Sequence, residues 1–277
     1  MFVDETVKAP RIEWRFGEVV AVVAETPSVK SLVLRVPGWP GHRAGQYVDV
    51  RLTAEDGYQA QRSYSIASAP EQGAPEQGAP EQNGAEAGAP GETEAPLVTL
   101  TVERLAEGEV SPFLADEVRV GDRLEVRGPI GGYFTWTVAD GGPLFLVAGG
   151  SGIVPLMAML RHRALAHAAA GAVPAVLLYS SRSYADVIYR DELARLASAG
   201  DGLRVVHTLT RGAPPGWEGY SRRIDRAMLA EVAPGPALRP LVYVCGPTPL
   251  VEFVANTLVE LGHDPLRVKT ERFGPTG

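Results

Sequence analysis

One short segment combines side chains that together suit a phosphorylated aromatic ligand. In residues 62–67, Arg62, Tyr64 and Ile66 alternate with small residues, as expected for a strand with two faces. An arginine offers a partner for phosphate, a tyrosine ring can lie on a flat heterocycle, and the hydroxyls of Ser63 and Ser65 can donate hydrogen bonds. Taken alone, the segment is better explained as a β-barrel strand with an exposed arginine.

A glycine-rich turn at residues 148–155 suits a pyrophosphate. Its small residues Gly149, Gly150 and Gly152 let the backbone come close to a ligand, and the free N–H groups at the start of the next helix, near Pro155, attract an anion. The turn lacks the spacing Gly-x-Gly-x-x-Gly, and no lysine follows it as in a Walker loop. A tight strand-to-helix turn without a ligand remains an equal alternative.

Other chemistries fit the sequence poorly. A single cysteine, Cys245, excludes an internal disulfide, a four-thiolate zinc site and an iron–sulfur cluster held by this chain. His162 and His167 are about 140° apart around a helix and do not face one metal. No metal site is therefore predicted. The cysteine usage and a start without the layout of a signal peptide favour a cytoplasmic protein.

Composition and charge limit the partners. The 277 residues are 45% hydrophobic and 21% charged, so the chain folds, and its net charge of −7 is a poor fit to broad nucleic-acid or anionic-membrane binding. Residues 70–96 hold six Glu, five Pro and five Gly but no Lys or Arg, which predicts a flexible insertion. The rest of the chain is nearly neutral, and Arg222, Arg223 and Arg226 form a candidate basic face for an acidic protein partner.

Short strands dominate the first half of the chain. Runs rich in Val, Leu and Tyr, separated by Pro and Gly, predict strands at 18–24, 29–36, 47–52, 63–66, 97–104 and 123–126. A short helix is expected at 111–118, with Ser111 as its cap. Strands without long helices between them predict an antiparallel barrel or sandwich over residues 10–138.

Strands and helices alternate in the second half, over residues 143–277. We expect strands at 144–148, 175–179, 204–210, 241–245 and 267–273, and helices at 155–169, 187–199, 224–232 and 249–261. This alternation predicts a doubly wound parallel sheet with a ligand crevice at the carboxyl ends of its strands. The uncharged stretch 141–160 is long enough to cross a bilayer, but its central glycines and Pro155 favour a strand, a loop and a helix instead of a membrane span.

Four motifs occur in the order known from one family. Arg62-x-Tyr64-Ser65, then Gly108-Glu109-Val110-Ser111, then the 149–155 turn, then Cys245-Gly246-Pro247 together resemble the ferredoxin–NADP reductase superfamily. The resemblance implies a Greek-key β-barrel that binds FAD, followed by an NAD(P)-binding α/β domain. It implies Arg62 on the FAD pyrophosphate, Tyr64 on the isoalloxazine, Ser63 beside them and Ser65 near flavin N5. The family often has two glycines where this chain has Glu107-Gly108.

The resemblance extends to the nicotinamide cofactor. It implies that the turn from Gly108 through Val110 to Ser111 binds the FAD pyrophosphate, and that the 149–155 turn faces the pyrophosphate of NAD(P)H. Cys245, Gly246 and Pro247 would bring the nicotinamide toward the flavin. Near the carboxyl end, Glu271 would help handle protons and Phe273 would cover the flavin. An aromatic in the core of an edge strand is the alternative for Phe273.

Charge favours NADPH over NADH, although NAD remains possible. Ser181 and Arg182 follow the second strand of the α/β half and Thr210 and Arg211 end the third, where a ribose 2′-phosphate calls for cations and donors. Arg182 can also be a solvated residue at a helix start.

The resulting expectation is a flavoprotein reductase with catalytic residues Ser65, Cys245, Glu271 and Phe273. It would pass hydride from NADPH to FAD and single electrons to a separate iron–sulfur protein, such as a ferredoxin, or to an oxygenase component. Two alternatives remain: an NAD(P)H:flavin reductase that releases reduced flavin, and a non-catalytic regulatory or assembly subunit that retains the fold.

Overall fold

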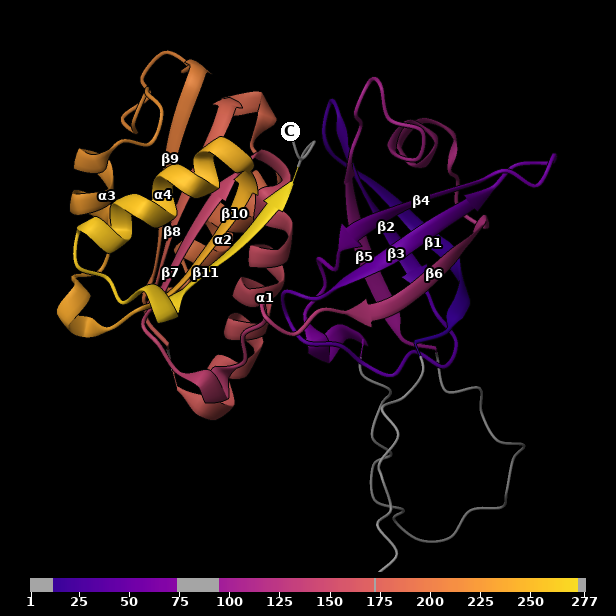
Figure 1. The fold of residues 1–277 in the computed structure, drawn as a ribbon, viewed down its shortest axis with the longest axis horizontal. Coiled ribbons are helices and arrows are strands. Elements are labelled where there is room, and N and C mark those ends of the chain that lie inside the picture. Colours follow the sequence, from indigo (N-terminus) through magenta and orange to yellow (C-terminus); the bar gives the residue numbers. More distant parts are fainter. Residues whose placement is uncertain (1–11, 74–94, 172, 274–277) are drawn as a thin grey trace, which may run out of the picture.

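The computed structural model describes residues 12–73, 95–171 and 173–273, which form two bodies joined through helix α1 (Ile153–Ala170) (Figure 1). The first body is a six-stranded antiparallel sheet with the order β4-β3-β6-β1-β2-β5. A bridge between Ile66 and Leu100 joins its two edges, which closes the sheet into a barrel. The predicted antiparallel barrel is confirmed. Its strands are β1 (Trp14–Thr26), β2 (Val29–Arg35), β3 (Tyr47–Thr53), β4 (Gln59–Ser65), β5 (Leu97–Glu103) and β6 (Arg123–Ile130).

Side chains alternate across the barrel wall. In β3, Val48 and Val50 are at most 1% exposed in the core, whereas Arg51 on the outer face pairs with Glu125. The strand expected at 63–66 begins earlier, at Gln59, because residues 59–65 pair along the whole of β3. The helix expected at 111–118 is one wide turn, Phe113–Glu117, in which Val118 N donates to Phe113 O.

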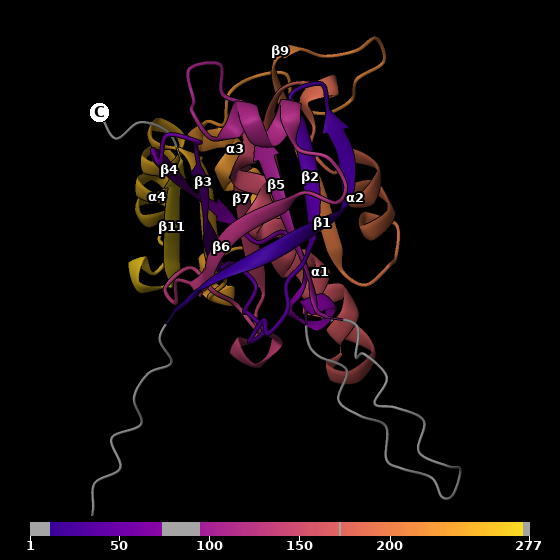
Figure 2. The ribbon, with the colours of Figure 1, turned by 90° about the vertical axis from the view of Figure 1, so that its right-hand side faces the viewer.

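The second body is a five-stranded parallel sheet with the order β11-β10-β7-β8-β9. Helices α1 and α2 (Arg190–Ala197) cover one face, and α3 (Arg226–Val232) and α4 (Thr248–Glu260) cover the other (Figure 2). This arrangement confirms the predicted doubly wound sheet, in which the strand order reverses between β7 and β10. Its strands are β7 (Leu144–Gly149), β8 (Ala175–Ser183), β9 (Leu203–Gly212), β10 (Leu241–Pro247) and β11 (Val268–Phe273).

Short 3₁₀ turns connect several elements. They span Pro70–Gly73, Val138–Asp140, Gly150–Gly152, Tyr184–Asp186, Pro236–Leu238 and Pro265–Arg267. The helix expected from residue 187 begins at Arg190, because Ser183 and Asp186 form a capping box around a separate turn and Tyr189 adopts a left-handed backbone with φ of 58°.

The expected flexible insertion begins with an ordered turn. Pro70–Gly73 contacts α1, and Glu71 Oε1 lies 2.5 Å from Nδ1 of His162 on that helix. The flexibility expected for the insertion at 70–96 stays a prediction, and residues 74–94 of it lie outside the described residues. Within the described ranges, no helix has the length and hydropathy needed to cross a membrane.

Helix α1 packs between the two bodies and joins their cores. Trp136 and Phe134, from the segment after β6, are buried in one cluster with Leu156 and Met159 of α1. This shared cluster places the carboxyl ends of the parallel strands against the β4–β5 side of the barrel, where the candidate site lies.

Candidate functional site

A cavity of about 400 Å³ lies where the two bodies meet. It runs between β4 and β5, which pair only through the Ile66–Leu100 bridge, so the facing strand edges leave room for a ligand. The barrel, the turn after β5, the start of α1 and the end of β11 all contribute to its wall. The lining residues are Arg62, Ser63, Tyr64, Ser65, Thr101, Glu103, Leu105, Gly108, Glu109, Val110, Ser111, Ser151, Val154 and Phe273.

The segment Arg62-Ser63-Tyr64-Ser65 ends β4 and supplies one wall. Although alternate residues of a strand point to opposite faces, all four border the cavity, because it follows an open edge of the strand. Tyr64 is half-buried, and burial raises its pKa to about 12, so its hydroxyl is protonated. Ser63 Oγ donates to Asp49 Oδ1 at 2.7 Å, which fixes this serine to the neighbouring strand.

Ser65 carries a buried hydroxyl without a partner. Its Oγ is shielded from solvent and makes no hydrogen bond within the described structure. An unsatisfied buried hydroxyl costs roughly 1–3 kcal/mol, so a ligand atom that bonds to it is favoured. Ser65 and Tyr64 line the same cavity, and a hydroxyl together with an aromatic ring suits a flat heterocycle with hydrogen-bonding atoms at its edge, as an isoalloxazine has.

The turn at Gly108–Ser111 closes the cavity on one side. A Cβ on Gly108 would lie 2.8 Å from Ser111 Oγ, so this turn admits only a glycine without rearrangement. Ser111 is not the helix cap that the sequence predicts: its Oγ accepts from Leu105 N at 3.1 Å and tightens the turn instead. Arg62 lies 3.7 Å from Glu109, an exposed pair that a phosphate can displace at little cost.

Two glycine-containing loops pack against each other at the carboxyl ends of β7 and β10. A Cβ on Gly152 would lie 2.2 Å from Cys245 O, and one on Gly246 would lie 3.1 Å from the Gly149 backbone. Close packing between loops thus explains these glycines, while Gly150 has a φ of +55° and open space around it. Pro155 is buried in the first turn of α1 and does not line the cavity.

Glu271 and Cys245 are neighbours across the β10–β11 pair. Burial raises the pKa of Glu271 to about 7, so this carboxyl can take up or release a proton near neutral pH. Burial, reinforced by the Glu271 charge, raises the pKa of the Cys245 thiol well above its usual value. Neither residue lines the cavity, but Phe273, two residues after Glu271, does.

Phe273 meets both expectations for this residue: it is an aromatic of an edge strand that packs on the core, and it also borders the cavity. It ends β11, an edge strand of the parallel sheet, and packs against the core around α1. It also lines the cavity together with Tyr64. The ring therefore has the position required of a cover over a ligand held by the barrel.

The residues expected to bind a 2′-phosphate are brought together at the ends of β8 and β9. Thr210 Oγ1 donates to Ser181 O at 3.3 Å. Arg182 and Arg211 are exposed, and neither forms an ion pair within the described ranges. This group lies outside the cavity wall, so it can serve only a ligand that extends across the end of the parallel sheet.

Sequence reasoning missed Thr101 and Glu103, which line the cavity from β5. In the sequence they are the polar face of an ordinary alternating strand. Thr101 is only 5% exposed, and its burial depends on the other domain. In the expected basic face, Arg222 pairs with Asp225 and Arg226 with Glu260, while Arg223 is exposed and forms no ion pair within the described residues. The two acidic partners reduce the positive charge of this face, and its role in docking stays a prediction.

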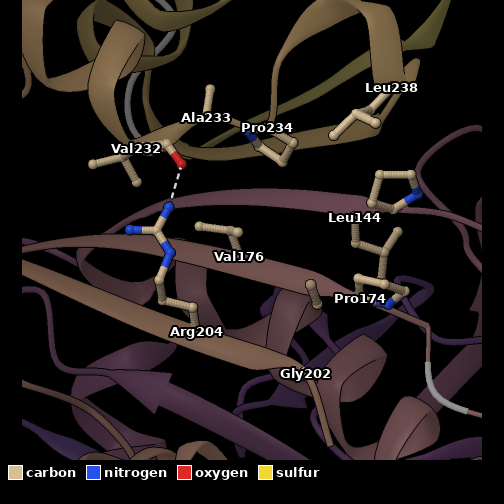
Figure 3. Close-up of a pocket in the computed structure, with 11 residues that line it drawn as sticks. Leu144, Pro174, Val176, Gly202, Arg204, Val232, Ala233, Pro234 and Leu238 are labelled. Atoms are coloured by element: carbon tan, nitrogen blue, oxygen red, sulfur yellow. Dashed lines mark hydrogen bonds between the residues drawn. The ribbon is translucent and has the colours of Figure 1, made fainter.

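A second cavity, of about 310 Å³, lies at the amino ends of β7, β8 and β9, opposite the carboxyl ends that face the barrel (Figure 3). Its wall is largely apolar, with Pro174, Val176 and Leu238, and its one charged side chain, Arg204, donates to Val232 O at 2.6 Å. Because it lacks convergent polar groups, it is a weaker candidate than the cavity between the domains.

Comparisons with known proteins agree with this geometry. Residues 146–256 match the family model described as an oxidoreductase NAD-binding domain. The chain is 33% identical over 237 residues to ferredoxin–NADP reductase B of Sorangium cellulosum, covering 83% of this chain and 84% of that protein. It is 32% identical over 235 residues to the glycine betaine monooxygenase reductase subunit of Pseudomonas aeruginosa, covering 84% of this chain but only 57% of that relative.

A similar fold is found among solved structures. The FAD/NAD-binding domain of nitric oxide dioxygenase from Vibrio cholerae aligns with a TM-score of 0.75 and 24% identity, covering 96% of this chain and all of that one. The fold thus agrees with the sequence similarity to the Sorangium reductase, which extends over most of both proteins. The chain therefore belongs to the ferredoxin–NADP reductase family of flavoprotein oxidoreductases.

Proposed function

We propose that this protein accepts hydride from NADPH onto bound FAD and passes the electrons singly to a separate protein. The observation that carries this proposal is the cavity between the domains, which brings Tyr64, the unpartnered Ser65 hydroxyl and Phe273 together. FAD supplies the conversion between two-electron and one-electron transfer. The chain's own residues bind and orient the two cofactors.

The barrel residues hold the flavin in this proposal. Tyr64 would bind the ring system, the unpartnered Ser65 hydroxyl would donate a hydrogen bond to it, and Phe273 would help to exclude water, since all three residues line the cavity. Arg62, which lies 3.7 Å from Glu109 in an exposed pair, would bind the pyrophosphate, because a phosphate offers more acceptor oxygens than a carboxylate. The N–H groups of the Gly108–Ser111 turn add donors to the same phosphates.

The α/β residues orient the nicotinamide cofactor. The 149–155 turn and the Cys245–Pro247 loop follow β7 and β10, the two neighbouring strands between which the strand order reverses, and dinucleotides bind at this point in doubly wound sheets. Glu271, with a pKa of about 7, holds or releases a proton beside Cys245. Arg182 and Arg211 are free to bind a 2′-phosphate, which supports NADPH over NADH.

The electron acceptor belongs to a class that the relatives suggest. One relative is a ferredoxin–NADP reductase and another is the reductase subunit of a monooxygenase. We therefore propose a ferredoxin or another iron–sulfur oxygenase component as the partner. With its single cysteine, the 277-residue chain lacks the thiolates for a cluster of its own.

Anaerobic stopped-flow spectroscopy tests the proposal. The holoprotein is mixed with NADPH or NADH, flavin absorbance is followed, and the reduced protein is then mixed with a ferredoxin. We expect NADPH to reduce the flavin faster than NADH does, and the ferredoxin to reoxidise the reduced flavin. Flavin that dissociates on reduction would instead support a flavin reductase, and bound flavin that NADPH does not reduce would support a non-catalytic subunit.

A further inference from the structure

A buried chain of hydroxyl groups crosses the junction between the two domains. Tyr189, just before α2, donates to Thr101 Oγ1 of β5 at 2.5 Å. Thr101 and Ser31 of β2 are 2.7 Å apart, and Ser31 donates to Glu25 Oε1 of β1 at 2.6 Å. Tyr189, Thr101 and Ser31 are each at most 5% exposed, so water does not compete for these bonds.

The hydrogen bonds between these hydroxyl groups all run in one direction, from Tyr189 toward Glu25. A hydroxyl has a single hydrogen, and the hydrogen of Ser31 is committed to Glu25. Thr101 must therefore donate to Ser31, which leaves its oxygen free to accept from Tyr189. Burial raises the pKa of Tyr189, so its hydroxyl is protonated near neutral pH and can donate. A phenylalanine at 189 would remove the hydrogen bond to Thr101, which is the one that crosses the junction between the domains.

Arg161 of α1 strengthens the same junction. It forms a bidentate pair with Glu192 of α2, at 3.0 and 2.6 Å, and its guanidinium lies 4.9 Å from the centre of the Tyr189 ring. Its remaining nitrogen donates across the junction to Ala67 O at 2.8 Å. Tyr189 and Arg161 thus hold the barrel at two points, and both belong to helical segments of the α/β domain.

These two points adjoin the proposed flavin site. Thr101 itself lines the cavity, and Ala67 follows Ser65 by two residues. On the other side, Arg161 lies on α1, which begins directly after the glycine-rich turn that faces the dinucleotide. The contacts therefore connect the wall that holds one cofactor to the helix that holds the other.

The backbone of Tyr189 indicates that its position is constrained. Its φ of 58° and ψ of 27° lie in the left-handed region, which bulky residues rarely occupy. Such a conformation persists where the surroundings fix it, and it is enriched at functional positions. Here it directs the phenol toward Thr101 instead of along α2.

We propose that Tyr189 is a positioning residue that, through Thr101, sets the angle between the two domains and thereby the distance over which hydride moves. The inference rests on the proposed function and deepens it. A further contact between the domains lies elsewhere: Tyr243 donates to Thr135 O at 2.9 Å. With this contact and the bond from Arg161 to Ala67 O still in place, loss of the Tyr189 bond removes one of the points that fix the angle between the domains, and the reacting atoms lose their alignment.

The Tyr189→Phe variant tests the proposal in two ways. Spin labels at Glu55→Cys in the barrel and Asn256→Cys in α4 report the distance between the domains, and the native Cys245 is buried and does not react. We expect a narrow distance distribution in the otherwise wild-type protein and a broad one with phenylalanine at 189. In unlabelled holoprotein, the rate of flavin reduction by NADPH should fall about tenfold, while NADPH affinity and bound FAD stay unchanged.

A double-mutant cycle identifies the bond responsible. If Tyr189 acts through Thr101, then Thr101→Val and the double variant slow reduction to the same extent as Tyr189→Phe. Tyr220→Phe is the matched control, because the Tyr220 hydroxyl faces Glu231 within its own domain, and it should alter neither readout.

The following results would contradict the positioning role of Tyr189, its action through Thr101, or the proposed function. An unchanged distance distribution, or an unchanged rate, in Tyr189→Phe contradicts the positioning role, and additive losses in the cycle contradict the route through Thr101. If wild-type protein with bound FAD is not reduced by NADPH, but Tyr189→Phe still broadens the distribution, the proposed function is wrong while the contact between the domains is supported.

Discussion

Replacement of Glu271 by glutamine should change how stability depends on pH. In the folded protein, burial raises the pKa of Glu271 from 4.5 to about 7. Between these values the folded state binds more protons than the unfolded state, so the free energy of unfolding falls as pH rises. The stabilisation is fully present below pH 4.5 and is lost as pH passes through 7. At 1.36 kcal/mol for each pKa unit, the loss is at most about 3 kcal/mol.

Glutamine cannot ionise, so the Glu271→Gln variant lacks this loss. Urea unfolding of both proteins, at pH values from 5 to 8.5 and with FAD present, measures the difference. At pH 8 the variant should be more stable than the wild type by about 2–3 kcal/mol, and near pH 5 the two should be nearly equal. Parallel pH profiles for the two proteins would refute a raised pKa for the partly buried Glu271 carboxyl.

Three further predictions concern substitutions of single residues. Ser65→Ala should stabilise the apoprotein by roughly 1 kcal/mol, because it removes an unpartnered buried hydroxyl, yet weaken FAD binding about tenfold; stability and affinity changes of the same sign would contradict this assignment. Gly152→Ala should cost about 3 kcal/mol in urea unfolding through its clash with Cys245 O, against about 1 kcal/mol for Gly150→Ala, and equal losses would contradict the packing of the two loops. Arg211→Ala should weaken NADPH binding about tenfold in titrations and NADH binding less than twofold, with the exposed Arg223→Ala as control; equal losses for both cofactors would exclude the 2′-phosphate contact.

Local patterns predicted the elements well because the information lies within each segment. Alternation in 47–52 and the apolar run in 144–148 reflect burial on one or both faces of a strand, and Gly or Pro marks the ends. Helix α2 began later than expected because Tyr189 takes a left-handed backbone that its residue type does not favour. The contact with the other domain that holds it there is invisible to a local pattern.

Site contacts between distant residues were harder to predict. The pairing of Arg226 with Glu260, 34 residues away, reduces the positive charge of a face that is basic in the local sequence. Thr101 gave no signal as a site residue, because its contact with Tyr189 joins positions 88 residues apart. By contrast, Arg62, Tyr64 and Ser65 lie in one strand, so their shared place in the cavity followed from a motif of four residues.

Anaerobic titration of the purified protein with NADPH is the most direct test of the central claim. We expect the protein to carry FAD, and one equivalent of NADPH to bleach its absorbance fully, with the electrons recovered by a ferredoxin added afterwards. Protein that binds no FAD, or bound FAD that keeps its absorbance in the presence of excess NADPH, would contradict the claim.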